Sequence, residues 1–188
     1  AGLAHDFLVS LRDEIETFDA DEIRARLVGA SGSFRKKAGR HVVSTADKIY
    51  CSFSTPAFAV ARQDARRDAA TRLKGFGLTR ENVEGKVALD LGCNAGAMLF
   101  ELNNLGLKAG LGVEFDYDKV QLAQEIARLS HADNLRFRQG NIDKLTASTL
   151  GAFDIVFALA IEGHVQDPAR LYQLLGDVCA EFLCFEGN

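Results

Sequence analysis

The sequence predicts an α/β protein in which helices cover both faces of a parallel sheet, preceded by a mainly helical N-terminal segment. From about residue 85 onwards, short apolar segments alternate with amphipathic ones, which is typical of a parallel sheet with crossover helices. Several of the short segments are continuously apolar, as strands buried on both faces are. We therefore divide the 188 residues into an N-terminal helical extension or cap, residues 1–80, and an α/β domain, residues 81–188.

Five strands and three intervening helices account for the α/β domain. The predicted strands are Lys86–Leu91, Ala109–Phe115, Leu135–Gln139, Phe153–Ala160 and Glu181–Glu186. The predicted helices are Gly96–Leu105, Tyr117–Ser130 and Pro168–Cys179. The third helix has a well-marked start, because Asp167 can cap it and proline suits the first helical position. Right-handed crossovers then predict the strand order 3-2-1-4-5.

The N-terminal segment shows helical spacing in two places. Asp19 and Glu22 form a capping-box pattern before a first helix, and a polar, basic loop is expected over Ser31–Gly39. A second helix is predicted from Thr55-Pro56 to the glycines at 75 and 77. Its apolar stripe consists of Phe58, Ala61, Ala65, Ala69 and Leu73. Its opposite face carries Arg62 and Arg66, one helical turn apart.

Charge and hydropathy exclude several functional classes. The net charge of −4 argues against non-specific nucleic-acid binding, and no apolar run approaches the roughly 20 residues of a membrane span. The charge is unevenly distributed: residues 1–80 hold 14 Lys and Arg against 10 Asp and Glu, whereas residues 81–188 hold 8 against 16. The basic N-terminal segment favours an anionic substrate, and an unevenly charged solvated surface is the alternative.

The four cysteines, Cys51, Cys93, Cys179 and Cys184, do not form a Cys-x-x-Cys pair and have no histidine at metal-ligand spacing. We therefore predict no metal site and interpret the cysteines as reduced, mostly buried thiols. The N-terminus also lacks the basic and apolar regions of a signal peptide. These features predict a cytoplasmic protein.

The turn after the first strand of the domain is the most informative segment. Asp90 lies near the end of this buried strand, and small residues follow it up to Gly96, where a helix begins. Ligands of open α/β sheets bind at the carboxyl ends of the strands, where the strand order reverses. A turn without bulky side chains allows a ligand to approach the backbone, and the free N–H groups of the helix attract an anionic group.

This turn resembles the first motif of the class I, Rossmann-like S-adenosylmethionine-dependent methyltransferases, Asp-x-Gly-x-Gly-x-Gly. The resemblance implies that Gly92, Cys93, Asn94 and Gly96 surround the methionine part of the cofactor, and that Asp90 orients the loop or reaches the amino group through water. Asn94 replaces the middle glycine of the motif, and asparagine is among the few residues that tolerate a positive φ.

Two further segments match the family in the expected order. By resemblance, Glu114 at the end of the second strand would bind both ribose hydroxyls, and Phe115 would pack on the adenine face. Capping of the following helix is the alternative role for Glu114. After the third strand, Asn141 would accept from the adenine amino group, with Asp143 as a fallback, and the backbone N–H of Ile142 would reach a ring nitrogen.

The segment after the fourth strand resembles Glu-His-Val-x-Asp-Pro-x-x-Leu of small-molecule methyltransferases, with Gly163 inserted. Ala158 begins it and is expected to line the cofactor. His164 is the first candidate for a catalytic base, because histidine titrates near neutrality, and Glu162 is the second. Upstream helices of the family often close over the cofactor, so Arg62 or Arg66 is expected to pair with its carboxylate.

The resemblance implies methyl transfer from S-adenosylmethionine to an oxygen or nitrogen of a small-molecule, sugar or lipid-type acceptor. The family's sheet ends with strands 6 and 7, which have no counterpart before Asn188. Three alternatives follow: the sequence is a fragment, the segment Arg40–Phe53 covers the open fifth strand, or a homodimer forms through that strand. A degenerate methyltransferase that binds the cofactor or a partner is an alternative. An NAD-dependent oxidoreductase fits less well, because the Gly-x-Gly-x-x-Gly pattern is missing.

Overall fold

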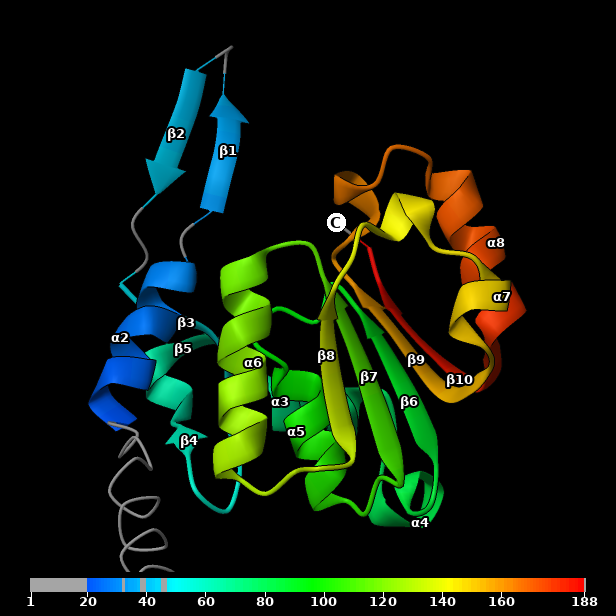
Figure 1. The fold of residues 1–188 in the computed structure, drawn as a ribbon, viewed down its shortest axis with the longest axis horizontal. Helices are drawn as coiled ribbons and strands as arrows, with labels where there is room; N and C mark the ends of the chain where they lie inside the picture. The colour runs from blue at the N-terminus through cyan, green and yellow to red at the C-terminus, as the bar shows by residue number, and fades with distance from the viewer. Residues whose placement is uncertain (1–19, 32, 38–39, 45–46, 188) are drawn as a thin grey trace, which may run out of the picture.

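The computed structural model describes residues 20–31, 33–37, 40–44 and 47–187. Its main feature is a sheet of five strands in the order β8-β7-β6-β9-β10, in which every neighbouring pair is parallel. Helices lie on both sides of this sheet, with α5 and α6 on one side and α7 and α8 on the other (Figure 1). The predicted α/β fold with a parallel sheet is therefore confirmed.

The elements of this domain begin and end within two residues of the predicted positions. The strands are β6 (Val87–Leu91), β7 (Ala109–Glu114), β8 (Leu135–Gln139), β9 (Phe153–Leu159) and β10 (Cys179–Glu186). The main helices are α5 (Ala97–Asn104), α6 (Tyr117–Leu129), the short α7 (Ala147–Leu150) and α8 (Pro168–Val178). Asp167 caps α8 by accepting from the backbone N–H of Arg170, as the sequence predicted.

Two apolar clusters hold the layers together. One lies between the sheet and α8 and includes Leu89, Val156 and Leu175. The other, larger cluster lies between the opposite face and the N-terminal segment, and includes Phe100 and Phe157. The alternation of side chains along each strand explains how the same strand supplies both clusters. It also places Asp90 on the face that carries Phe157, because the two residues are register partners in β6 and β9.

The prediction of a mainly helical N-terminal segment is wrong. The structure has the helix α2 (Ala20–Ala30), the hairpin β1 (Ser33–Lys37) and β2 (Arg40–Ser44), and a three-stranded sheet of β3 (Ile49–Ser54), β4 (Ala59–Val60) and β5 (Ala65–Asp68). The short helices α3 (Ala69–Gly75) and α4 (Arg80–Val83) follow. The loop predicted over 31–39 therefore contains β1, and Asp19 of the predicted capping box lies outside the described residues.

Of the helix predicted from Thr55 onwards, the structure contains only the last part, α3, which begins at Ala69. Before it, β5 pairs in parallel with β3, so that Cys51 lies opposite Arg67. This pairing buries Ala65 and leaves the next two arginines exposed, a pattern that also satisfies the apolar spacing of a helix. β5 forms its backbone hydrogen bonds with β3, which is distant in sequence. The spacing of apolar residues within β5 therefore cannot predict this pairing. Among the described residues, no helix is both long and apolar enough to cross a membrane.

Candidate functional site

The turn between β6 and α5 has the backbone geometry that its small residues predict. Gly92, Asn94 and Gly96 have φ angles of 76°, 51° and 85°. Asn94 stabilises its own conformation, because its Oδ1 accepts from the N–H of Ala95 at 2.8 Å. The expectation that asparagine takes the place of a left-handed glycine is therefore confirmed.

Both glycines of this turn are tightly packed against neighbouring side chains. A Cβ atom on Gly92 would lie 2.5 Å from Cγ2 of Ile161, and one on Gly96 would lie 2.7 Å from the ring of Phe137. The turn is also fixed to the next strand, because the N–H of Gly92 donates to the carbonyl oxygen of Val113 at 2.8 Å. Any larger residue would push the turn away from the carboxyl edge of the sheet.

Glu114, at the end of β7, holds the turn from the side. Its Oε2 accepts from the N–H of Asn94 at 2.9 Å, and its Oε1 accepts from the N–H groups of Phe115 and Asp116 at 2.8 and 3.0 Å. A carboxylate offers about four acceptor positions, so one remains in this arrangement. Binding two hydroxyl groups would require one backbone bond to open. The alternative role of Glu114, capping of the following helix, is wrong, because Asp116 caps α6 by accepting from the N–H of Asp118.

The residues expected around adenine lie at the same edge. The Phe115 side chain is 71% exposed, which is unusual for a phenylalanine and leaves its ring free to pack on a ligand. The Oδ1 of Asn141 accepts from the N–H of Asp143 at 2.9 Å, and thereby caps the short helix η2 (Ile142–Lys144). This oxygen has a second lone pair that can accept from another donor.

Asp90 lies beneath the turn rather than on the surface. It is only 3% exposed, and its burial, together with the nearby Glu114 carboxylate, raises its pKa to about 7, although Arg72 acts in the opposite direction. Cys93 and Ala158 are also buried. The thiol of Cys93 would lie 2.7 Å from a Cβ atom on Gly112, so it packs between strands and only its backbone borders the turn. Burial raises the pKa of this thiol well above its usual value.

The arginine expected beside the cofactor is placed differently by the structure. Arg62 lies in the short helix η1 (Arg62–Asp64), with a side chain that is 66% exposed and an Nη1 that is 3.9 Å from Asp68. Arg66 lies in β5, where its guanidinium donates to the carbonyl oxygen of Ser31. The prediction that one long helix carries both residues on the same face is therefore wrong.

Arg72, which was not among the predicted site residues, pairs with a glutamate at the carboxyl edge of the sheet. It lies on α3, its side chain is 14% exposed, and its Nη2 is 2.6 Å from Oε2 of Glu186 at the end of β10. Its positive charge also acts against the rise in the pKa of Asp90 that burial causes. The sequence contained one signal for it, since Arg72 belongs to the part of the predicted helix that exists.

Glu162 and His164 lie together in the short helix η3 (Glu162–His164), which follows β9. The His164 side chain is exposed, and its backbone N–H donates to the carbonyl oxygen of Ile161 at 2.9 Å. Glu162 accepts a hydrogen bond from the hydroxyl group of Tyr172 on α8. Both candidates for the base are therefore close to the carboxyl edge of β9, as the sequence predicted.

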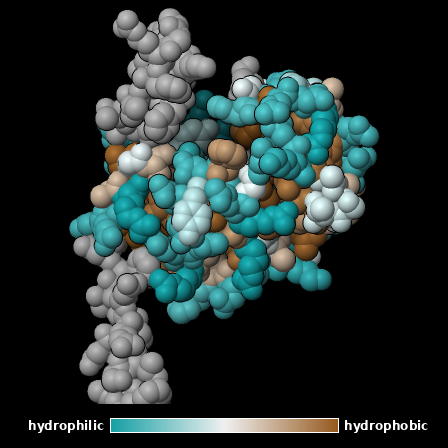
Figure 2. Space-filling view, turned by 45° about the horizontal axis from the view of Figure 1, so that its top comes forward, coloured by the Kyte–Doolittle hydropathy of each residue, from teal (hydrophilic) through white to brown (hydrophobic). Residues whose placement is uncertain are grey.

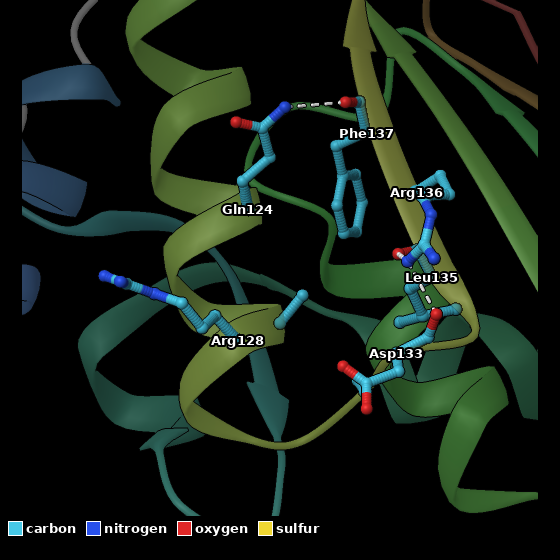
Figure 3. Close-up of a pocket in the computed structure, with 8 residues that line it drawn as sticks. Gln124, Arg128, Asp133, Leu135, Arg136 and Phe137 are labelled. Carbon is cyan, nitrogen blue, oxygen red and sulfur yellow. Dashed lines mark hydrogen bonds between the residues drawn. The ribbon is translucent and has the colours of Figure 1, made fainter. Parts of the chain in front are cut away.

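The carboxyl edge of the sheet lies toward the top of Figure 1. Figure 2, in which the top of the molecule is turned forward, shows mainly hydrophilic side chains with apolar ones between them. A separate hollow of about 300 Å³ lies between α6 and β8. The residues that border it include Gln124 of α6 and Asp133, Arg136 and Phe137 in and just before β8. Gln124 donates a hydrogen bond to the carbonyl oxygen of Phe137 at 2.9 Å (Figure 3). This hollow does not belong to the candidate site.

Comparison with known proteins adds the family. Residues 82–182 match the family model described as "Methyltransferase domain". The chain is 30% identical over 89 residues to a ubiquinone biosynthesis O-methyltransferase of Albidiferax ferrireducens, which covers 47% of the chain and 35% of that protein. It is 33% identical over 90 residues to the enzyme of the same name from Methylococcus capsulatus, covering 48% and 37%. The match spans about a third of the length of these relatives.

Solved structures support the same fold. The N-terminal domain of EvdMO1 with SAH bound superposes with a TM-score of 0.58 at 22% identity, covering 88% of this chain and 65% of that one. The same domain in the presence of SAH and D-fucose gives a TM-score of 0.57 at 24% identity, covering 88% and 64%. Because the family model matches more than half of the residues, the chain belongs to the methyltransferase-domain family.

Proposed function

We propose that this chain binds S-adenosylmethionine at the carboxyl edge of β6 and β7 and transfers its methyl group to a small-molecule, sugar or lipid-type acceptor. One observation carries the proposal. The left-handed turn of Gly92, Asn94 and Gly96 is joined directly to the carboxylate of Glu114, so a glycine-rich turn and an acidic strand end meet at one place. A nucleoside linked to an amino acid fits both features, since the turn suits close backbone approach and the acid suits a ribose.

Each part of the cofactor has a fitting group in this proposal. Glu114 would accept from the ribose hydroxyls after giving up one backbone donor, and the exposed ring of Phe115 would pack on the adenine. Asn141 would accept from the adenine amino group, and the N–H of Ile142 would donate to the ring. We assign the role first expected of Arg62 to Arg72, whose guanidinium is held by Glu186 at the end of β10.

The cofactor would supply an activated methyl group and its leaving group, so the chain mainly has to position the acceptor and exclude water. His164, or Glu162 as the second candidate, would accept the proton from an acceptor hydroxyl group or amine at the end of β9. The names of the curated relatives favour an oxygen as the methylated atom.

Replacing Glu114 by alanine is expected to weaken the binding of S-adenosylhomocysteine at least tenfold. The variant loses the ribose acceptor and also the hydrogen bond that fixes Asn94, and each charge-assisted hydrogen bond contributes about 1.5–3 kcal/mol. Isothermal titration calorimetry measures the affinity directly. Glu125→Ala is the control, because this glutamate pairs with Arg26 between α2 and α6. Equal affinities of wild type and Glu114→Ala would remove Glu114 from the ribose site.

Replacing His164 by alanine is expected to lower turnover while leaving cofactor affinity nearly unchanged. A positioned base contributes about 10²–10⁴-fold to the rate, whereas an exposed side chain on η3 contributes little to the turn after β6. Turnover is measured as transfer of a labelled methyl group to members of a panel of catechols, sugars and amines. Full activity of the variant on an acceptor that the wild type methylates would exclude His164 as the base and leave Glu162 to be tested.

A further inference from the structure

An ion pair links the N-terminal segment to the last strand of the sheet. Arg72 on α3 and Glu186 at the end of β10 are separated by 114 positions in sequence, yet their charged groups are 2.6 Å apart. Only 14% of the Arg72 side chain is exposed, compared with 36% of the Glu186 side chain. The pair is therefore partly shielded from water. This shielding makes its charged hydrogen bond stronger than it would be on an open surface.

The pair lies at the edge where the cofactor is proposed to bind. Glu186 is the register partner of Leu159 in β9, and its carbonyl oxygen accepts from the N–H of Ala160 at 2.7 Å, directly after that strand. The neighbouring strand β6 leads into the turn at Gly92. The guanidinium of Arg72 thus lies near the point where the chain connections from β6 and β9 diverge, which is where ligands of such sheets bind.

The charge of Arg72 also acts on a buried carboxyl group. Asp90 is buried below the edge, and the charge of Arg72 acts to lower its pKa. Burial disfavours the charge of Arg72 itself, but the attraction and the hydrogen bond of Glu186 outweigh this effect and raise its pKa. Glu186 at the rim is therefore the carboxylate that stabilises the charge of Arg72.

We propose that Glu186 is a positioning residue that holds the guanidinium of Arg72 at the rim, where it binds the carboxylate of the cofactor's methionine part. This inference rests on the proposed function. The hydrogen bond to Glu186 occupies one of the five donors of Arg72, so others remain for a second carboxylate. Without Glu186, the guanidinium would lose the contact that holds it at the rim, and the cofactor would lose its partner.

The test compares two ligands that differ only in the group that Arg72 is proposed to bind. Calorimetry measures the affinities of S-adenosylhomocysteine and of its decarboxylated analogue for wild type, Glu186→Ala, Arg72→Ala and the double variant. We expect Glu186→Ala to lower the affinity for S-adenosylhomocysteine about tenfold, as expected for the loss of one well-placed charged hydrogen bond. The affinity for the decarboxylated analogue should stay nearly unchanged. In the Arg72→Ala background, the same substitution should have no further effect.

Glu181→Ala is the matched control, because Glu181 lies on the same strand and pairs with Lys86 at 2.5 Å near the opposite end of the sheet. It should change neither affinity. An equal loss of affinity for both ligands in Glu186→Ala would indicate a purely structural role and overturn the proposal. Tighter binding of S-adenosylhomocysteine would also overturn it, because Glu186 would then compete with the ligand. If the wild type binds neither ligand, the proposed function itself fails.

Discussion

Replacing Asp90 by asparagine is expected to raise the free energy of unfolding above pH 7. Burial raises the pKa of Asp90 from 3.8 to about 7 in the folded protein. Between these two values the folded state holds a proton that the unfolded state has lost, so the stability of the wild type falls as the pH rises. The difference of about three pKa units corresponds to a loss on the order of 4 kcal/mol, which is complete just above pH 7. Asparagine has a similar size and no charge, so the variant escapes this loss.

Urea unfolding of the wild type and Asp90→Asn at several pH values between 4 and 8 tests this expectation. The gain in stability of the variant should grow with pH up to about 7 and then stay constant. Comparing the two proteins at each pH cancels the contributions of other titrating groups. A gain that does not depend on pH would show that Asp90 is not a buried group of raised pKa.

Replacing Phe157 by alanine is expected to destabilise the protein by about 3–5 kcal/mol. Phe157 is fully buried in β9, between Asp90 of β6 and Cys184 of β10. Its ring contacts that of Phe76 edge-on, with centroids 6.2 Å apart, and so joins the N-terminal segment to the sheet. A central strand cannot collapse into the space left by the ring, so the cavity persists. Urea denaturation measures the loss.

Phe115→Ala is the control for this experiment, because it removes the same ring from a position that is 71% exposed. The stability of this variant should stay within about 0.5 kcal/mol of the wild type. Its affinity for S-adenosylhomocysteine should nevertheless fall, because the exposed ring is proposed to pack on the adenine. Similar stabilities of the Phe157 and Phe115 variants would contradict the packing of β9 in the core.

The centre of the sheet could be predicted from the sequence because β6 and β9 are buried on both faces. β6 and β9 consist almost entirely of apolar residues, and the helices between the strands have caps or apolar stripes that local rules describe well. The N-terminal segment could not be predicted in the same way. In β5, the side chains of Ala65 and Arg67 are placed by hydrogen bonds to β3, whose contribution is not encoded in local spacing.

The same contrast applies to the candidate site. The turn from Gly92 to Gly96 and the acid at Glu114 follow one another closely along a βαβ unit, so their meeting point follows from topology. The ion pair of Arg72 with Glu186 joins opposite halves of the chain, and only the packing of α3 beside the sheet brings the two residues together. The wrong prediction of one long helix carrying Arg62 and Arg66 has the same origin, because the pairing of β5 with β3 joins residues that are distant in sequence.

Calorimetric titration of the folded wild-type chain with S-adenosylhomocysteine tests the central claim most directly. We predict saturable binding at one site per chain, which is weakened in Glu114→Ala and retained in Glu125→Ala. Circular dichroism of the same sample establishes that the protein is folded. The absence of any binding of either S-adenosylmethionine or S-adenosylhomocysteine to the folded chain would contradict the claim that the turn after β6 holds this cofactor.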